Sequence, residues 1–385
     1  MQRVYLDNAA TTPMHEEVIA AMADCMRSTY GNPSSTHVFG REAKAQMELS
    51  RKKIADLLHV HPSEIVFTSC GTESNNFIIR SSVEHLGVER IITSTLEHKC
   101  VQETVHEMET HRNIEVLRVK LDSWGTVDYA DLEEKLKASP KKTLVTLMHA
   151  NNEIGNLLDV KKVRALCDEV GAYFHTDTVQ TLGHYPLDLH DLGVDFASCS
   201  AHKLHGPKGI GFAFVKKSIH FKPQITGGGQ ERNLRSGTEN VYGVVGMAKA
   251  FEMALQDLDQ HRQHIEGLKT YAIERLRTEI PGIEFNGHSA DLEKSLYTVL
   301  SLRLPFNNPL IGFELELKGI AVSQGSACSS GAAKVSAVIQ SILTPEQIEK
   351  STPLRISFSC YNTKEDIDAL VSVLKQVAEK HMVTA

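Results

Sequence analysis

Several short polar clusters follow apolar runs of strand length, and their residue types could together bind and activate an organic ligand. The clusters are Ser69-Cys70-Gly71-Thr72, Glu97-His98-Lys99, Asn151-Asn152, Asp177 with Gln180, and Ser200-Ala201-His202-Lys203. A glycine turn that opens a helix leaves backbone N–H groups and a positive dipole end available to a phosphate. A lysine amine condenses with carbonyl compounds to form a Schiff base. The set therefore indicates phosphate binding combined with covalent capture by a lysine.

Each cluster taken alone has an ordinary structural explanation. The glycine turn could be a capped helix start, with Thr72 or Ser69 as the cap. His98 could be a capping or core histidine, and Lys203 could be one solvated lysine among many. The argument for a site is that successive strands all end in such groups, because ligands of an open α/β sheet bind outside the carboxyl ends of its strands.

Strands and helices alternate from about residue 15 to 260 and are expected to position these groups. Apolar runs predict strands at Glu64–Thr68, Arg90–Ser94, Leu144–His149, Ala172–Thr176, Asp195–Ser200 and Ile210–Val215. Helical segments such as Val160–Val170 lie between them, which indicates βαβ units around a mostly parallel sheet. The last run follows a Gly/Pro/Lys turn and could be antiparallel. We expect a large domain over 15–257, and a smaller α+β domain formed by 1–14 and 258–385. A long polar helical stretch from Phe251 to about Ile280 is predicted at their junction.

Composition excludes several other classes of protein. The 385 residues carry a net charge of −7, so the chain lacks the basic surface of a nucleic-acid binder. No signal peptide and no membrane span is predicted. The seven cysteines are scattered and include no CxxC pair, which argues against disulfides and against a metal site. A reducing, cytoplasmic location is expected.

Pyridoxal phosphate is the ligand that this set of groups suits best. The lysine supplies the amine, the glycine turn binds the phosphate, and a carboxylate at a strand end keeps the pyridine nitrogen protonated so that the ring withdraws electrons. An ion pair at ~4 Å with an effective dielectric near 20 contributes about 4 kcal/mol. A carboxylate such as Asp177 can therefore hold that proton, whereas an amide cannot.

At these residues the sequence resembles the NifS/IscS-type cysteine desulfurases, a branch of the class-V aminotransferases. The resemblance covers nearly the whole chain. It rests on ordered motifs: Tyr5-Leu-Asp-Asn-Ala-Ala-Thr-Thr-Pro13, Gly31-Asn-Pro-Ser-Ser35, Gly71-Thr-Glu-Ser74, Glu97-His-Lys99, Asn151-Asn-Glu-Ile-Gly155, His202-Lys203, Gly227-Gly-Gly-Gln-Glu-Arg232, Arg235-Ser-Gly-Thr238 and Gly325-Ser-Ala-Cys328. It implies the α/β fold of the fold-type I enzymes, with a mostly parallel seven-stranded sheet in the large domain.

The resemblance also implies a role for each site residue. Lys203 would hold the cofactor and move protons, and His98 would stack on the ring and act in acid–base steps. Asp177 would pair with the ring nitrogen and Gln180 with the ring hydroxyl. The remaining roles are phosphate binding by Gly71, Thr72, Ser200 and His202, phosphate binding by Thr238 from the other subunit of a homodimer, and substrate binding by Asn152 and Arg355.

Cys328 is the cysteine that the resemblance singles out. Small polar residues flank it in Ser323-Gln-Gly-Ser-Ala-Cys-Ser-Ser-Gly-Ala332, whereas a buried structural cysteine more often has bulky apolar neighbours. A glycine-flanked loop suits a nucleophile that must reach the substrate and then leave. The implied reaction converts L-cysteine to L-alanine and leaves a persulfide on Cys328. A sulfur-acceptor protein, for iron–sulfur cluster or thio-cofactor synthesis, would then take the sulfur.

Two features depart from the family pattern. The chain ends at Ala385, earlier than IscS-like members whose longer tail helps to dock the scaffold protein, so another acceptor is possible. Cys360 stands near the substrate arginine where relatives often have a basic residue, and we interpret it as a buried thiol without a catalytic role.

Two other functions fit part of the sequence. A selenocysteine lyase, or another fold-type I lyase or aminotransferase, would keep the cofactor and change the reaction. An aminotransferase would not need Cys328. A non-catalytic sulfur-carrier or assembly subunit is disfavoured, because Lys203, Asp177, His98 and Cys328 are all present.

Overall fold

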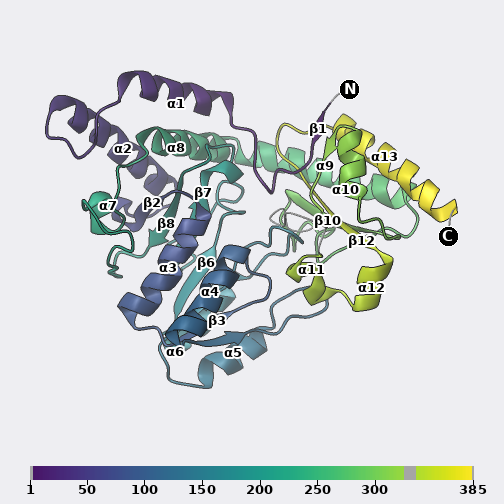
Figure 1. The fold of residues 1–385 in the computed structure, drawn as a ribbon, viewed down its shortest axis with the longest axis horizontal. Coiled ribbons are helices and arrows are strands. Elements are labelled where there is room, and N and C mark those ends of the chain that lie inside the picture. The colour runs from purple at the N-terminus through teal and green to yellow at the C-terminus, as the bar shows by residue number, and fades with distance from the viewer. Residues whose placement is uncertain (1–2, 325–334, 384–385) are drawn as a thin grey trace.

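A seven-stranded sheet forms the centre of the larger part of the molecule (Figure 1). The computed structural model describes residues 3–324 and 335–383. The strand order is β2-β8-β7-β6-β5-β3-β4, and β8 alone runs antiparallel to its neighbours. The strands are β2 (Ile65–Thr68), β3 (Arg90–Thr93), β4 (Glu115–Arg118), β5 (Thr143–Thr146), β6 (Tyr173–Asp177), β7 (Phe196–Ser200) and β8 (Gly211–Val215). The predicted α/β fold and the antiparallel strand are confirmed.

Helices cover both faces of this sheet, which is why most residues of its strands are buried. Successive residues of one strand point to opposite faces. Val66 packs with helices α3 (Gly71–Leu86) and α4 (Lys99–Arg112), whereas Phe67 packs in a second cluster on the other face. That face is covered by α2 (Val38–Leu57), α5 (Tyr129–Lys137), α6 (Val160–Val170) and α8 (Val241–Gln256), and α1 (Glu16–Ser28) packs on α8.

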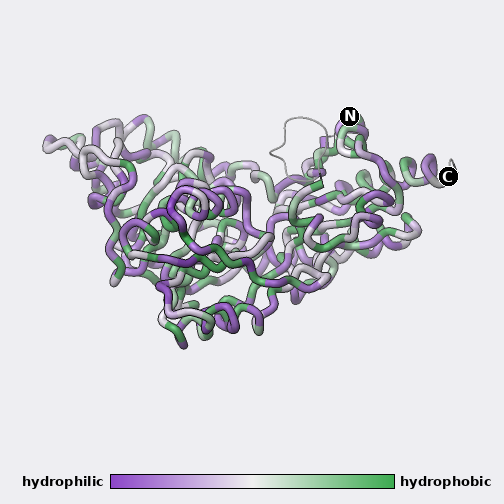
Figure 2. Tube along the Cα trace, turned by 60° about the horizontal axis from the view of Figure 1, so that its bottom comes forward, coloured by the Kyte–Doolittle hydropathy of each residue, from purple (hydrophilic) through white to green (hydrophobic). Residues whose placement is uncertain are grey.

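A smaller part of the chain has a core of its own. Its antiparallel sheet has the order β12-β10-β9, and a parallel pair joins β1 (Val4–Tyr5) to β11 (Ile320–Ala321). The other elements are β9 (Glu284–Phe285), β10 (Val299–Leu304), β12 (Thr352–Ser357), α9 (Leu258–Glu279), α10 (Ile311–Leu317), α11 (Ala337–Ile342), α12 (Pro345–Lys350) and α13 (Lys364–Val383). Figure 2 shows hydrophobic stretches in both parts of the molecule.

The junction between the two parts corrects one expectation. The sequence predicted a continuous helix from Phe251 to about Ile280, but the structure has two helices, α8 and α9, separated at Asp257. The pairing of β1 with β11 places the N-terminal residues with the C-terminal part, which supports the proposed division into 15–257 and 1–14 plus 258–385.

Three short elements complete the fold: the 3-10 helices η1 (Pro62–Glu64) and η2 (Ala201–Lys203), and helix α7 (Gln230–Asn233). In α7, Glu231, Arg232 and Asn233 all have left-handed backbone angles, with φ of 47°, 58° and 64°. Within the part of the chain that the structure describes, no helix is long and apolar enough to cross a membrane.

Candidate active site

The carboxyl ends of β2, β3, β5, β6 and β7 lie at one edge of the central sheet, because these strands are mutually parallel. The predicted site residues follow these ends. Gly71 follows β2, His98 follows β3, and Asn152 follows β5. Asp177 is the last residue of β6, and Lys203 ends η2 directly after β7. The sheet topology therefore brings these five residues to the same edge of the sheet, as the sequence predicted.

The first turn of α3 has the features of an anion site. Its N-cap, Cys70, makes no side-chain hydrogen bond to the turn, so the dipole end carries no side-chain cap. A Cβ atom on Gly71 would lie 2.7 Å from Cγ2 of Val179, so the close approach of these segments requires glycine. That Cβ position lies 3.7 Å from Cβ of Ser200, whose buried hydroxyl has no hydrogen-bond partner. A buried hydroxyl without a hydrogen-bond partner destabilises the folded protein unless a ligand or a water molecule bonds to it.

Asp177 is buried and fixed by two hydrogen bonds. Its Oδ2 accepts from Nδ2 of Asn75 at 2.7 Å, and its Oδ1 accepts from the backbone N–H of Val179 at 2.9 Å. Asn75 lies on α3, one turn after Gly71. One rigid helix thus carries both the anion site and the partner of the carboxylate.

The N-terminal segment holds the amine of Lys203. Nζ of Lys203 donates to the carbonyl oxygens of Ala9 at 2.5 Å and Ala10 at 2.9 Å. Nε2 of Gln180 donates to the same Ala9 oxygen at 3.0 Å. Next along the segment, the hydroxyl of Thr11 lies 3.1 Å from Nδ1 of His202. Gln180, His202 and Lys203 are therefore brought together through residues 9–11.

The ring of His98 is exposed, yet surrounding protein desolvates it and lowers its pKa. The charge of Asp177 opposes this change and the charge of Lys203 adds to it. Both groups are therefore close enough to His98 to act on it electrostatically. The neutral form of His98 at pH 7 can accept a proton.

Arg355 lies on β12 in the smaller part and faces the same region. Its Nη2 donates to Oδ1 of Asp7 at 2.7 Å, and its Nη1 donates to the backbone oxygen of Asn152 at 2.9 Å. Nε of Arg355 is buried without a partner. The bond to Asn152 connects this arginine to the strand edge that carries the other candidates.

Two candidates are not brought into this group. Thr238 is exposed in the turn between α7 and α8, and Cys328 lies outside the described residues. The segment of Thr238 is tied to the first turn of α3, since Nε of Arg235 donates to Oε1 of Glu73 at 2.8 Å. The roles of these two residues stay predictions.

Cys360 is a half-buried thiol near the segment that follows Lys203, and its lack of a catalytic role stays a prediction. Its Sγ lies 3.8 Å from Nε2 of His205, and burial raises the pKa of the thiol to about 11. Such a thiol is protonated at pH 7 and is a poor nucleophile.

Sequence reasoning missed Asn75 and Asp7, the partners of Asp177 and Arg355. Asp7 lies in the N-terminal motif, and Asn75 directly follows Gly71-Thr-Glu-Ser74. In a helix that begins at Gly71, Asn75 lies one turn later and therefore on the same face as Gly71. This spacing could have identified Asn75 as a site residue. No local signal could have paired Asp7 with an arginine near the other end of the chain.

Comparison with known proteins agrees with the motifs. Residues 4–370 match the model of the family described as aminotransferase class-V. A cysteine desulfurase IscS of Dictyoglomus turgidum is 39% identical over 98% of this chain and 95% of its own length. A cysteine desulfurase IscS of Methanosarcina thermophila is 37% identical over 98% and 92%.

Solved structures are similar as well. A NifS-like protein superposes with a TM-score of 0.89 at 38% identity, covering 98% of this chain and 100% of the other. A NifS-like protein from Rickettsia africae gives 0.87 at 30% identity, covering 98% and 100%. The resemblance to NifS/IscS proteins is confirmed. On this sequence and structural similarity, the chain belongs to the class-V aminotransferase family.

Proposed function

We propose that this protein is a pyridoxal-phosphate-dependent cysteine desulfurase that converts L-cysteine to L-alanine and passes the sulfur to Cys328. One observation carries the proposal: Lys203, Asp177 and His98 meet at one sheet edge, beside a helix terminus that no side chain caps. Its near full-length relatives that bear the name cysteine desulfurase support the choice of substrate.

The residues of the site fit the cofactor. The first turn of α3 and the unpartnered hydroxyl of Ser200 would bind the phosphate, with Thr72 and His202 beside them. Asp177, held by Asn75, would face the ring nitrogen. Gln180 would bind the ring hydroxyl, His98 would stack on the ring, and Lys203 would form the covalent link. When bound, pyridoxal phosphate supplies an electron sink for charge that develops at the substrate's α-carbon.

Lys203 would then act as the base at that α-carbon. In that role its amine would be free of the covalent link to the cofactor. The carbonyl oxygens of Ala9 and Ala10, which now accept from Nζ, keep the freed amine near the reacting atoms. A base held in position can contribute about 10²- to 10⁴-fold to the rate.

Arg355 would bind the carboxylate of cysteine. A planar guanidinium can form two parallel hydrogen bonds with a carboxylate. Asp7 and the backbone oxygen of Asn152 fix the guanidinium from two sides, and Nε of Arg355 has no protein partner. The substrate carboxylate would thus meet an arginine that is already oriented, next to the side chain of Asn152.

Cys328 would take the sulfur. A free cysteine is only a few per cent ionised near pH 7, so a base must accept its proton. Neutral His98 is suited to this step, because desolvation lowers its pKa. The Cys328 thiolate attacks the substrate sulfur and the substrate's C–S bond breaks. The bonding electrons stay with the carbon, which takes up a proton and leaves as alanine. Cysteine and one thiol thus yield alanine and one persulfide.

The remaining features of the proposal concern the assembly and the sulfur acceptor. Thr238 would bind the phosphate of the neighbouring subunit, which makes each site of the homodimer depend on both chains. Its exposure in a single chain leaves the hydroxyl accessible for that contact. An acceptor protein for iron–sulfur cluster or thio-cofactor synthesis would take the sulfur from Cys328, in the cytoplasm.

Replacement of Cys328 by serine tests this assignment, with Cys360→Ser as the matched control. We expect Cys328→Ser to keep the visible absorbance of the bound cofactor and its bleaching by borohydride, but to lose alanine formation from cysteine. Cys360→Ser should keep both, because desolvation raises the pKa of the Cys360 thiol to about 11 and leaves it a poorer nucleophile than an ordinary cysteine. Full activity of Cys328→Ser would show that Cys328 is not the nucleophile. Failure of the wild type to bind the cofactor would refute the function itself.

A further inference from the structure

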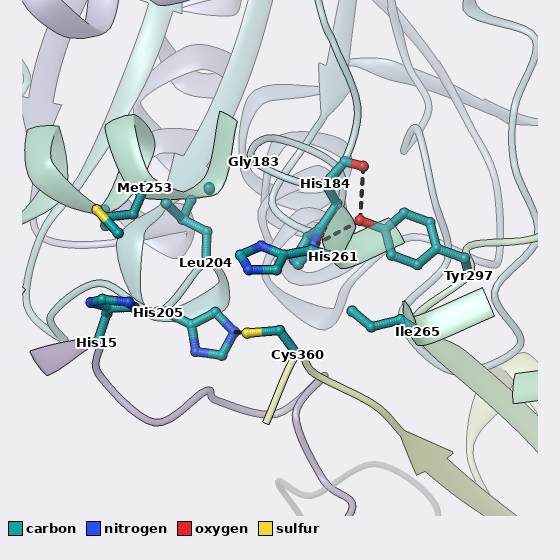
Figure 3. A pocket seen from close by; sticks show the side chains of 12 residues that line it. His15, Gly183, His184, Leu204, His205, Met253, His261, Ile265, Tyr297 and Cys360 are labelled. Atoms are coloured by element: carbon teal, nitrogen blue, oxygen red, sulfur yellow. Dashed lines mark hydrogen bonds between the residues drawn. The ribbon is translucent and has the colours of Figure 1, made fainter. Parts of the chain in front are cut away.

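A small cavity lies next to the chain segment that begins at Leu204, directly after Lys203 (Figure 3). Its volume is about 30 Å³, enough for a water molecule. Leu204 and His205, the two residues after Lys203, form part of its wall. Other wall residues come from elements far apart in the sequence: His15, His184, His261, Tyr297 and Cys360, with apolar side chains of α8 and α9 between them.

His184 bonds from this cavity to the backbone of Lys203. Its Nε2 lies 3.1 Å from the carbonyl oxygen of Lys203. Because a carbonyl oxygen only accepts, Nε2 must carry the proton. Desolvation lowers the pKa of His184, so the ring is neutral at pH 7 and is held in one tautomer.

Tyr297 holds His184 in turn. The hydroxyl of Tyr297 donates to the backbone oxygen of His184 at 2.9 Å and lies 3.4 Å from its Nδ1 (Figure 3). Tyr297 is 1% exposed and packs in the core of the smaller part, two residues before β10. Because β10 pairs with β12, which carries Arg355, these bonds connect the Lys203 turn to the sheet of the predicted substrate arginine.

Other contacts hold the residues on either side of Lys203. The hydroxyl and backbone N–H of Thr12 both donate to the carbonyl oxygen of His202 at 2.9 Å. The same hydroxyl accepts from the backbone N–H of His205 at 2.8 Å. The bond from His184 is made to the peptide group that directly follows the Cα atom of Lys203, so it helps to fix the direction in which the lysine side chain leaves the backbone.

We propose that His184 is a positioning residue for Lys203, acting through the backbone carbonyl of the lysine. This role rests on the proposed function, in which Lys203 binds the cofactor and moves the proton. A misplacement of about 1 Å at a reacting group can cost 10²-fold in rate. Loss of the bond would leave binding by Arg355 and Asn152 intact, so kcat should fall while KM for cysteine stays close to the wild-type value.

The test compares two replacements of His184 with one of His261. His184→Met fills a similar volume without an N–H donor, whereas His184→Gln keeps a donor. His261→Met changes the same cavity from α9 and spares the bond to the lysine carbonyl. Three quantities are measured: steady-state kcat and KM for cysteine, thermal unfolding, and the rate at which apoprotein captures pyridoxal phosphate on Lys203, trapped with borohydride and assigned by peptide mass.

We expect His184→Met to lower kcat by on the order of tenfold to a hundredfold and to slow the capture of pyridoxal phosphate on Lys203. Its unfolding temperature should equal that of His261→Met. His184→Gln should recover most of both losses. The positioning role would be overturned if His184→Met and His261→Met lost kcat and capture rate equally. It would also be overturned if His184→Gln recovered neither quantity. Normal capture and kcat in His184→Met would also overturn it while the cofactor function stands. Absence of a Lys203 adduct in the wild type would instead refute the proposed function, and the positioning role with it.

Discussion

Asn75 donates a 2.7 Å hydrogen bond to the buried carboxylate of Asp177, 102 residues further along the chain. Because Asn75 follows Gly71 by one turn of α3, the helix sets the spacing between the anion site at its start and the carboxylate at the end of β6. A phosphate and a ring nitrogen on one cofactor require such a fixed spacing.

Replacement of Asp177 by asparagine should abolish most of the activity without unfolding the protein. An amide cannot stabilise a protonated ring nitrogen, and a lost ion pair of about 4 kcal/mol corresponds to roughly three orders of magnitude in rate. The measurement is alanine formation at saturating cofactor, with the visible absorbance as a check on occupancy. Asn75→Ala should lower the rate of alanine formation by a smaller factor, about ten- to a hundredfold, because it removes one hydrogen bond to a charged group. An Asp177→Asn enzyme with more than a tenth of wild-type activity would contradict the assignment.

Mixed dimers should test the role of Thr238 across the subunits. Thr238→Ala should weaken cofactor binding, and Lys203→Ala should abolish activity. If Thr238 acts on the neighbouring subunit, a heterodimer of the two variants has one site with both Lys203 and Thr238. Refolding the variants together at limiting cofactor should therefore restore activity that neither variant has alone. No gain on mixing, with heterodimers verified by mass, would place Thr238 outside the neighbour's site.

Glu231 should contribute strongly to stability. Its carboxylate accepts from both Nη atoms of Arg51, at 2.9 and 2.7 Å, and from the backbone N–H of Phe67 at 2.8 Å. These bonds hold the left-handed residues of α7 in place. Removal of one partner of a buried ion pair costs about 3–5 kcal/mol. Chemical denaturation of Glu231→Gln should show a loss of this size.

Glu48 offers the matched comparison. It pairs with the same arginine at 3.2 Å, but its side chain is 37% exposed, compared with 3% for Glu231. Exposed ion pairs contribute up to about 1 kcal/mol. Similar losses in Glu48→Gln and Glu231→Gln would show that burial does not decide the strength of these pairs.

Glu97 should make stability depend on pH. Its Oε1 accepts from Ser94 and from the N–H of Met148, its Oε2 is buried without a partner, and desolvation raises its pKa to about 8. Between the unfolded pKa of about 4.3 and about 8, the folded protein keeps a proton that the unfolded chain loses. Rising pH in that range therefore favours unfolding.

Glu97→Gln removes this proton and keeps the oxygen that accepts both bonds. The difference in melting temperature, variant minus wild type, should increase as the pH rises from 5 to 8. Above pH 8 this difference should stay constant. Glu103→Gln, at an exposed position of α4, should show no such trend. A difference between Glu97→Gln and the wild type that is constant over the whole range would exclude a neutral Glu97.

The elements that position the site could be predicted because their signals are local. Val160–Val170 was predicted at its observed bounds, and most strands lie within a residue or two of theirs. The break at Asp257 was missed because the residues around it continue a helical pattern. β4 also went unpredicted, since Glu115 and Arg118 interrupt its short apolar pattern.

The sequence by itself determined the alternation of strands and helices, the glycine turn before α3, the lysine after β7 and the family, because these depend on residue types and on spacing within short segments. Only the tertiary structure decided which partners orient these groups. Asp7 meets Arg355 across 348 positions of the chain, and His184 meets the carbonyl of Lys203 from another loop. Such contacts follow from the packing of the two sheets and their helices, which no local pattern records.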